Sequence, residues 1–260
     1  VRAFENDDIV HVSGKVSPID DIEIINTELI LSDLSIVEKL YQKAQKNTKS
    51  GQKEGMPMKE LVEKILTALK EGTSLRKLTF GKEELVLLKN FQLLTLKPVL
   101  YVANVNENGF ENNPHMDLIL EYAIEDHSRV VPICAEIEAE ICELSNDEKK
   151  EFLLEMGQNE SGLDRLIKAG YDLLGLHTYF TAGEKEVKAW TITVGDSAPV
   201  AAGKIHTDFE KGFIRAETIS FQDYITYKGE KGAKDAGKLR TEGKDYVVKD
   251  GDIMHFLHNT

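Results

Sequence analysis

Residues 98–107 constrain the fold more than any other stretch of this chain. Residues 99–103 form a short apolar run, which is typical of a strand buried on both faces of a sheet. The run leads directly into the polar residues 104–107 and then into the turn-forming pair Asn108-Gly109. Because open α/β sheets bind ligands at the carboxyl ends of their strands, the sequence predicts a ligand-binding loop at residues 104–107.

A second strand and a second polar loop follow after one helix. The pair Asn113-Pro114 predicts the start of that helix, with Asn as the N-cap and Pro at the first helical position. Residues 130–133 form another apolar strand, which ends in Cys134-Ala135-Glu136. A right-handed crossover would place both polar loops at the same edge of a parallel sheet. We therefore expect the two loops to hold a flat base between them.

The first loop resembles the base-recognition motif Asn-Lys-x-Asp of P-loop GTPases. Asn104 and Glu107 have the spacing of its Asn, which braces the loop, and its carboxylate, which accepts hydrogen bonds from the base. The segment 134–136 stands where GTPases carry a Ser-Ala-Lys or Ser-Ala-Leu loop, whose backbone amide touches the base. A match of four residues is not specific, so the alternative for residues 104–107 is an ordinary strand-to-loop turn with solvated side chains.

Composition limits the class of protein. The chain has 260 residues, of which 41% are hydrophobic and 30% charged, and no apolar run approaches the ~20 residues of a membrane span. Two cysteines without C-x-x-C spacing favour a reduced, cytoplasmic setting. The net charge of −13 argues against a protein that binds nucleic acid over its whole surface. Residues 178–260 are nearly neutral, with 12 Lys and Arg against 13 Asp and Glu, so RNA would be repelled least there.

The first half of the chain predicts a helical insertion within an α/β sheet. Residues 1–16 are expected to form a strand, including His11, and then a loop. Helices are expected over residues 20–46, 57–72 and 82–91. The first two carry facing apolar stripes and are joined by a polar loop, which predicts an antiparallel hairpin. The sheet is expected to resume at Thr95, and a capping box at residues 145–148 predicts a later helix.

From about Thr178 the spacing of apolar residues changes from helical to strand-like. Strands are expected over residues 187–194, 213–219, 246–248 and 253–256, with a tight turn at Asp250-Gly251 joining the last two. A helix is expected over residues 231–241. The result is a small α+β domain with a core around Trp190 and Phe213.

One motif in this region is misleading. Residues 232–239 match the G-x-x-x-x-G-K pattern of a phosphate loop but end in Leu239. A phosphate loop needs Ser or Thr at that position for magnesium, and a buried strand before it. The sequence therefore predicts that this segment does not bind phosphate.

Taken together, these segments resemble the Obg-like ATPase (YchF) family of P-loop NTPases. The resemblance covers essentially the whole chain and is carried by residues 4–9, 104–107, 179–183, 187–190, 205–216 and 250–252. It implies an α/β fold: a P-loop NTPase sheet (residues 1–16 and 91–177) interrupted by an antiparallel α-helical hairpin (residues 17–90). A C-terminal β-grasp domain of the TGS type (residues 178–260) would follow.

The resemblance also implies a function. Family members bind ATP in preference to GTP, hydrolyse it slowly with Mg²⁺ and associate with ribosomes, so a ribosome (50S or 70S) or RNA is the implied partner, with no membrane or DNA partner. Asn104, Val105 and Glu107 are implied to contact adenine. The remaining expected nucleotide-site residues are Asn106, Cys134, Ala135 and Glu136.

The catalytic half of such a site is not among these residues. The family's phosphate loop, its magnesium ligands and its Asp-x-x-Gly segment have no counterpart in the sequence, which begins at Val1 without an initiator Met. Phosphoryl transfer depends on that cradle and its metal. We therefore expect a piece of a longer NTPase that is inactive by itself.

Two other functions remain open. The first is a non-catalytic module that binds RNA or the ribosome through the C-terminal domain, with four side chains facing phosphates; the alternative for these four is a solvated strand-and-loop face. The second is a scaffold that binds a partner through the acidic helical hairpin. The four side chains are Lys204, His206, Lys211 and Arg215.

Overall fold

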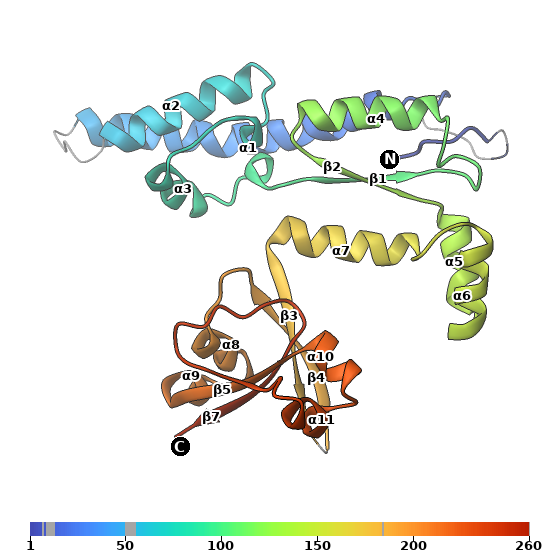
Figure 1. Cartoon of the computed structure of the whole chain (residues 1–260). Coiled ribbons are helices and arrows are strands. Elements are labelled where there is room, and N and C mark those ends of the chain that lie inside the picture. Colours follow the sequence, from blue (N-terminus) through green and yellow to red (C-terminus); the bar gives the residue numbers. More distant parts are fainter. Residues whose placement is uncertain (7, 9–13, 50–55, 184, 260) are drawn as a thin grey trace. The chain divides into compact units, whose positions relative to one another are not determined.

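The computed structural model describes residues 1–6, 8, 14–49, 56–183 and 185–259. The chain divides into two compact units, Val1–Ala169 and Gly170–Thr260 (Figure 1). The strand expected at His11 and most of the polar loop expected between the first two helices lie outside the described residues. None of the described helices combines the length and the apolar character that a membrane span requires.

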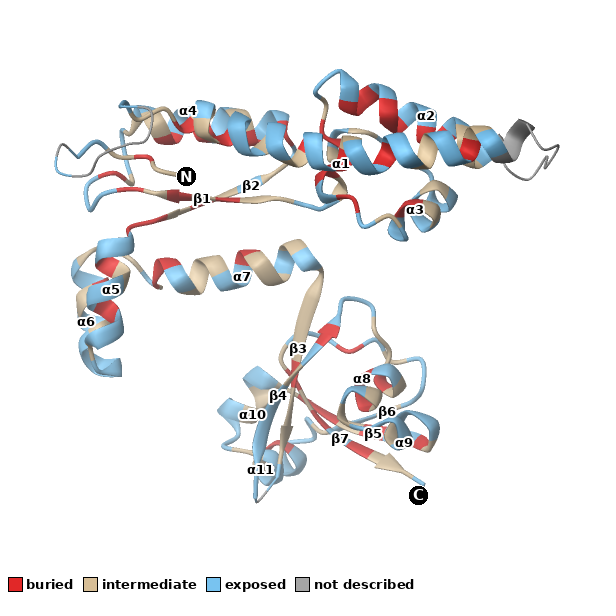
Figure 2. Ribbon diagram, turned by 180° about the vertical axis from the view of Figure 1, so that it is seen from behind, coloured by how far each residue is buried: buried red, intermediate tan, exposed pale blue. Residues whose placement is uncertain are grey.

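Long helices dominate the first half of the first unit. Helix α1 (Pro18–Lys49) lies beside α2 (Met56–Lys70), and the short helix α3 (Lys82–Lys89) follows. Two 3₁₀ turns, η2 (Leu75–Lys77) and η3 (Leu94–Leu96), complete this region. Apolar residues at helical spacing form its core, and the ribbon of Figure 2 is red where residues are buried. The largest contributors include Val37, Leu61, Val62, Ile65, Leu69, Leu75 and Leu88.

The expectation that the sheet resumes at Thr95 is wrong. Thr95 is fully buried within η3, where its backbone N and Oγ1 both donate to Asp33 Oδ2 at 2.7 Å. Leu94 N donates to the other carboxylate oxygen of Asp33 at 2.9 Å. These hydrogen bonds to a carboxylate on α1 hold the segment in a turn. A buried carboxylate needs hydrogen-bond donors, and if residues 94–96 formed a strand, their backbone N–H groups would no longer be available to Asp33.

The sheet of the first unit has the predicted strand–helix–strand order. Strand β1 (Leu100–Asn104) pairs in parallel with β2 (Arg129–Ile133), in a register that places Asn104 opposite Ile133. Helix α4 (Pro114–Glu125) connects them, and the Asn113 side chain caps it by accepting from His115 N and Met116 N. On the other side of β1, Arg2 forms a bridge to Asn104.

Helices follow the second strand. Helix α5 (Ala135–Glu143) starts directly after β2, and α6 (Asn146–Glu155) begins at the predicted capping box, where Ser145 N donates to Glu148 Oε2 at 2.9 Å. Helix α7 (Gly162–Leu174) is capped by Glu138, whose carboxylate accepts from Gly162 N at 2.6 Å. The boundary between the two units falls within α7.

The second unit is built on a five-stranded mixed sheet with the order β4-β3-β7-β5-β6. The strands are β3 (Leu176–Ala182), β4 (Val187–Thr193), β5 (Phe213–Ser220), β6 (Arg240–Glu242) and β7 (Asp252–His258). Strand β7 pairs with β5 at seven positions but with β3 at only one, Phe180 opposite Ile253. The sheet is therefore joined unevenly on the two sides of β7.

Four short helices accompany this sheet (Figure 1). They are α8 (Ala198–Ile205), α9 (Thr207–Lys211), α10 (Phe221–Thr226) and α11 (Glu230–Asp235). The core contains Tyr179, Phe213 and Phe256 together with three alanines of α8, Ala198, Ala201 and Ala202. Trp190 is partly buried at the edge of this core.

Two expected elements of the second unit differ in the structure. Residues 246–248 form no strand: Val247 makes an isolated bridge to Ser197, and Asp252 Oδ2 accepts from Tyr246 Oη at 2.7 Å, which folds the segment into a loop. Asp250-Gly251 is therefore a turn leading into β7 and not the tip of a hairpin. The helix expected to reach residue 241 ends at Asp235, and residues 240–242 form β6.

Candidate nucleotide-base site and a pocket in the second unit

The two polar loops of the first unit meet at one edge of its sheet. Asn104 Oδ1 accepts a hydrogen bond from Ala135 N at 3.1 Å, and Val105 N donates to Ile133 O at 2.8 Å. These bonds join residues that are far apart in sequence. The loops are thus held together in the way that the parallel crossover predicts.

The first loop turns tightly after Asn106. Gly109 N donates to Asn106 O at 2.9 Å, which closes a turn. A Cβ at Gly109 would lie 2.5 Å from Asn106 Oδ1 and 3.0 Å from Val105 Cβ. A larger residue at this position would therefore have to displace the Asn106 side chain, because the loop packs against its own start.

The expected site residues divide into buried and exposed positions. The side chains of Val105 and Cys134 are each only 2% exposed and belong to the core beneath the loops. Only the backbone of these two residues is available to a ligand. Glu107, Asn106 and the segment Ala135-Glu136 are exposed at the sheet edge, so the side chains there can reach a bound ring.

A cavity of about 400 Å³ adjoins the first loop, and sequence reasoning missed it as a site. Its lining includes Phe4, Glu5, Asn106 and Asn108, and His115 Nε2 lies 3.1 Å from Glu5 Oε1. Phe4 supplies an aromatic ring beside the polar loop. The signal was present in the sequence, since Phe4 lies in one of the segments that carry the family resemblance.

A buried ion pair connects the inserted helices to this sheet. Asp126, the C-cap of α4, accepts from Arg76 Nε at 3.0 Å and from Tyr101 Oη at 2.8 Å, and its side chain is fully buried. Arg76 Nη2 also donates to Asn26 Oδ1 at 2.9 Å. Burial raises the pKa of Tyr101 to about 12, so this hydroxyl remains a donor at neutral pH. α1, η2, β1 and α4 thus share one polar network.

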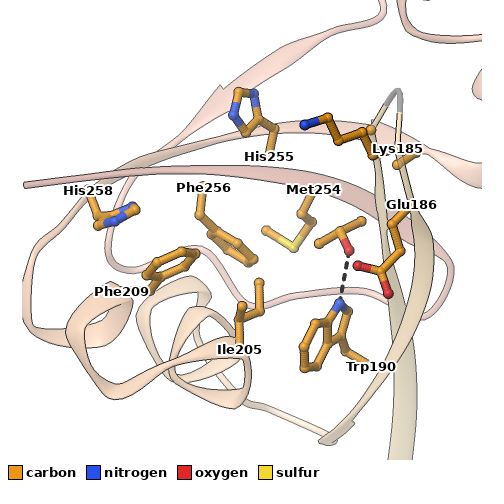
Figure 3. Close-up of a pocket in the computed structure, with 12 residues that line it drawn as sticks. Lys185, Glu186, Trp190, Ile205, Phe209, Met254, His255, Phe256 and His258 are labelled. Atoms are coloured by element: carbon orange, nitrogen blue, oxygen red, sulfur yellow. Dashed lines mark hydrogen bonds between the residues drawn. The ribbon is translucent and has the colours of Figure 1, made fainter.

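The second unit contains a larger pocket of about 670 Å³ (Figure 3). Trp190 lies at one end, where its Nε1 donates to Thr181 Oγ1 at 2.9 Å. Phe209 and His258 stack at the other end, with ring centroids 3.8 Å apart. Ile205, Met254 and Phe256 lie between the two ends and make the middle of the pocket apolar.

The four expected phosphate-contacting residues of this unit are all exposed but do not form one patch. Lys204 lies on α8, Lys211 on α9, and His206 between them, where its Nδ1 accepts from Asp208 N at 3.2 Å and caps α9. Arg215 lies on β5, next to Ala216, which faces α8 in the core. Because neighbouring strand residues face opposite sides, Arg215 is on the other face of the sheet. Three of the four residues thus lie on or between helices, whereas the alternative interpretation was a solvated strand-and-loop face.

The comparisons with known proteins cover the whole chain. "Ribosome-binding ATPase YchF" of Escherichia coli O157:H7 is 59% identical over 259 residues, which span 100% of this chain and 71% of that protein. The protein of the same name in Bacillus subtilis (strain 168) is 52% identical over 262 residues, which span 100% of this chain and 72% of the relative. The solved structure of the Schizosaccharomyces pombe YchF GTPase superposes with a TM-score of 0.84 at 35% identity, covering 99% of this chain and 70% of that one.

The second unit also matches a family model of its own. Residues 176–259 match YchF-GTPase_C, which is described as a protein of unknown function (DUF933). The names of the relatives describe nucleotide hydrolases: the two bacterial proteins are named ATPases, and the protein in the solved structure is named a GTPase. The fold and these matches define the class as an α/β NTPase with a C-terminal mixed-sheet unit. The chain belongs to the YchF family.

Proposed function

We propose that this chain supplies the base-recognition and C-terminal parts of an ATP-preferring, ribosome-associated NTPase. The observation that carries the proposal is the bond from Ala135 N to Asn104 Oδ1, which braces the two loops together as in base-binding GTPases. Glu107, exposed on the braced loop, is the acceptor for the base edge. The cytoplasm is the compartment that fits this function.

The length of the Glu107 side chain is compatible with the proposed preference for adenine. Glutamate carries one methylene more than the aspartate of GTPases, so its carboxylate reaches a different point on the base edge. Adenine presents N6–H₂ as a donor there, and a carboxylate accepts from it in a charge-assisted bond. GTP is expected to bind more weakly.

The described residues fit the base better than they fit the phosphates and Mg²⁺. They offer an aromatic ring at Phe4 and a carboxylate at Glu107 beside the braced loops. The 260 residues contain no G-x-x-x-x-G-K-[ST] segment. These residues alone are therefore expected to be inactive in ATP hydrolysis.

In the full-length protein, Glu107→Asp should move nucleotide preference from ATP toward GTP. A carboxylate-to-base contact contributes about 1.5–3 kcal/mol, so the ratio of ATP to GTP affinity should fall roughly tenfold or more. Titration with both nucleotides measures the ratio. Glu121→Asp, the same change at an exposed position of α4, is the matched control. An unchanged ratio would show that Glu107 does not contact the base.

A second candidate function is RNA or ribosome binding through the second unit, which we infer to be the TGS-type domain. Its support is a separate sheet and core, and two exposed lysines on adjoining helices, Lys204 and Lys211. The chain otherwise carries a strong negative charge. Exposed lysines can contact the phosphates of RNA and release the counterions bound there.

Reversing the charges on these helices tests this function. Lys204→Glu combined with Lys211→Glu should weaken co-sedimentation with ribosomes and make its salt dependence shallower, by about one released counterion per lost contact. The control is Arg215→Glu on the opposite face of the sheet. Full co-sedimentation by the folded double variant across a salt series would exclude this surface. The acidic helical hairpin would then be the better candidate for a protein partner.

A further inference from the structure

The pocket of the second unit lies where β3 and β7 cease to pair. The two strands pair only at Phe180 and Ile253. Beyond this pair the pocket is bounded by the β3–β4 hairpin, by the side chains of β7 and by α8 and α9 (Figure 3). Its volume of about 670 Å³ is in the range of small-molecule sites, which hold ligands of nucleotide size.

The lining is rich in rings. Figure 3 shows Trp190 at one end, the stacked pair of Phe209 and His258 at the other, and Phe256 between them. A flat heterocycle that enters the pocket would therefore meet aromatic side chains as well as the thioether of Met254. Every nucleobase has a face that stacks on aromatic side chains, and such stacking is largely independent of sequence.

The rim carries cations. Lys185 lines the pocket near His255. Lys188 does not line the pocket, and its Nζ lies 4.1 Å from the centroid of the Trp190 ring. Two acids oppose them: Glu186 lines the pocket, and Glu217 lies 3.7 Å from His255 Nδ1. Lys185 is placed to face a phosphate of a nucleotide whose base occupies the pocket.

We propose that this pocket binds one unstacked base of single-stranded RNA, with Lys185 facing a flanking phosphate. The proposal rests on the RNA-binding function proposed above and names the part of the unit that receives the base. An extended peptide is the competing occupant, since it would pair with the open edge of β7. The ring faces and the cationic rim favour the nucleotide.

The chain contains a built-in reporter for this binding. Trp190 is its only tryptophan and lines the pocket, so a base that enters should quench the intrinsic fluorescence. The probe is a mixed-sequence single-stranded RNA of about 12 nucleotides. We expect saturable quenching, and binding weakened on the order of tenfold by Phe209→Ala. Phe221→Ala removes an exposed ring of the same unit that does not line the pocket, and should leave binding unchanged.

An abasic oligonucleotide separates the base from the phosphates and requires no variant. It should bind more weakly than the intact RNA and should not quench Trp190. Equal binding and equal quenching by the abasic strand would overturn the proposal. RNA binding without quenching would overturn the pocket but leave the RNA-binding function in place, whereas failure to bind RNA or ribosomes at all would remove both. Quenching by an extended acidic peptide, and not by RNA, would assign the pocket to a protein partner.

Discussion

Asp126→Ala is expected to destabilise the first unit by about 3–5 kcal/mol, because it removes one partner of a buried ion pair. Arg76, whose side chain is 7% exposed, would keep its charge without the carboxylate, and Tyr101 would lose its acceptor. Urea denaturation measures the loss as a lower midpoint. Glu125→Ala, at the exposed neighbouring position, should change stability by no more than about 0.5 kcal/mol. If Asp126→Ala changed stability as little as Glu125→Ala, the buried polar network would not be stabilising the first unit.

The effect of Asp126 should depend on pH in a defined direction. Burial by itself raises the pKa of Asp126, but hydrogen bonds from Arg76, Tyr101 and Ser128 outweigh it and hold the pKa below its ordinary value. A carboxyl with a lowered folded-state pKa stabilises the fold above its ordinary pKa of about 3.9, and loses this contribution as the pH falls through the folded-state value. The stability difference between Asp126→Ala and the wild type should therefore shrink below about pH 4.

Gly232→Ala is expected to destabilise the second unit by about 1–3 kcal/mol, even though alanine favours helices. A Cβ at Gly232 would lie 1.9 Å from Tyr227 O, a backbone atom that cannot move without displacing α10. Thermal unfolding followed by Trp190 fluorescence measures the change. Gly243→Ala, where a Cβ meets nothing within 4 Å, is the control and should be nearly neutral. An unchanged melting temperature for Gly232→Ala would show that α10 and α11 can separate at little cost.

Gly232 and Gly237 explain the misleading G-x-x-x-x-G-K pattern. Gly232 allows α11 to approach the end of α10 closely, and Gly237 follows α11 with a φ of 69°, which glycine adopts without strain. Helix α10, and not a strand, precedes the segment. The glycines here serve helix packing and helix termination, so the pattern has a structural cause that involves no phosphate.

Elements with strong local signals were predictable from the sequence. β1, α4 and β2 follow from apolar runs and from the Asn113 cap, and the meeting of the two loops follows from the handedness of the crossover. In contrast, η3 depends on hydrogen bonds to Asp33, which is distant in sequence. The loop at residues 246–248 depends on a hydrogen bond to Asp252, which lies in the following strand. No local sequence pattern indicates such hydrogen bonds, so the prediction of strands at these two places was wrong.

Small residues account for other omissions. Helix α8 buries alanines and no large apolar side chain in its central turn, so its sequence lacks the hydrophobic periodicity that indicates an amphipathic helix. At the candidate site, the sequence places Asn104 and Glu107 on a loop but cannot say that Val105 faces the core or that Phe4 lines a neighbouring cavity. The burial of Val105 and the position of Phe4 both depend on the path that the chain takes after β1.

The uneven pairing of β7 has a consequence for local unfolding. Seven register pairs join β7 to β5, whereas one joins it to β3, so the β3–β4 pair can separate from the rest of the sheet at a lower free energy than the unit as a whole unfolds. The pocket lies along this boundary. A ligand that binds only when β3–β4 is joined to the rest of the sheet raises the free energy needed to separate them. Occupancy of the pocket would therefore make the β3–β4 pair and the rest of the sheet unfold as one cooperative unit.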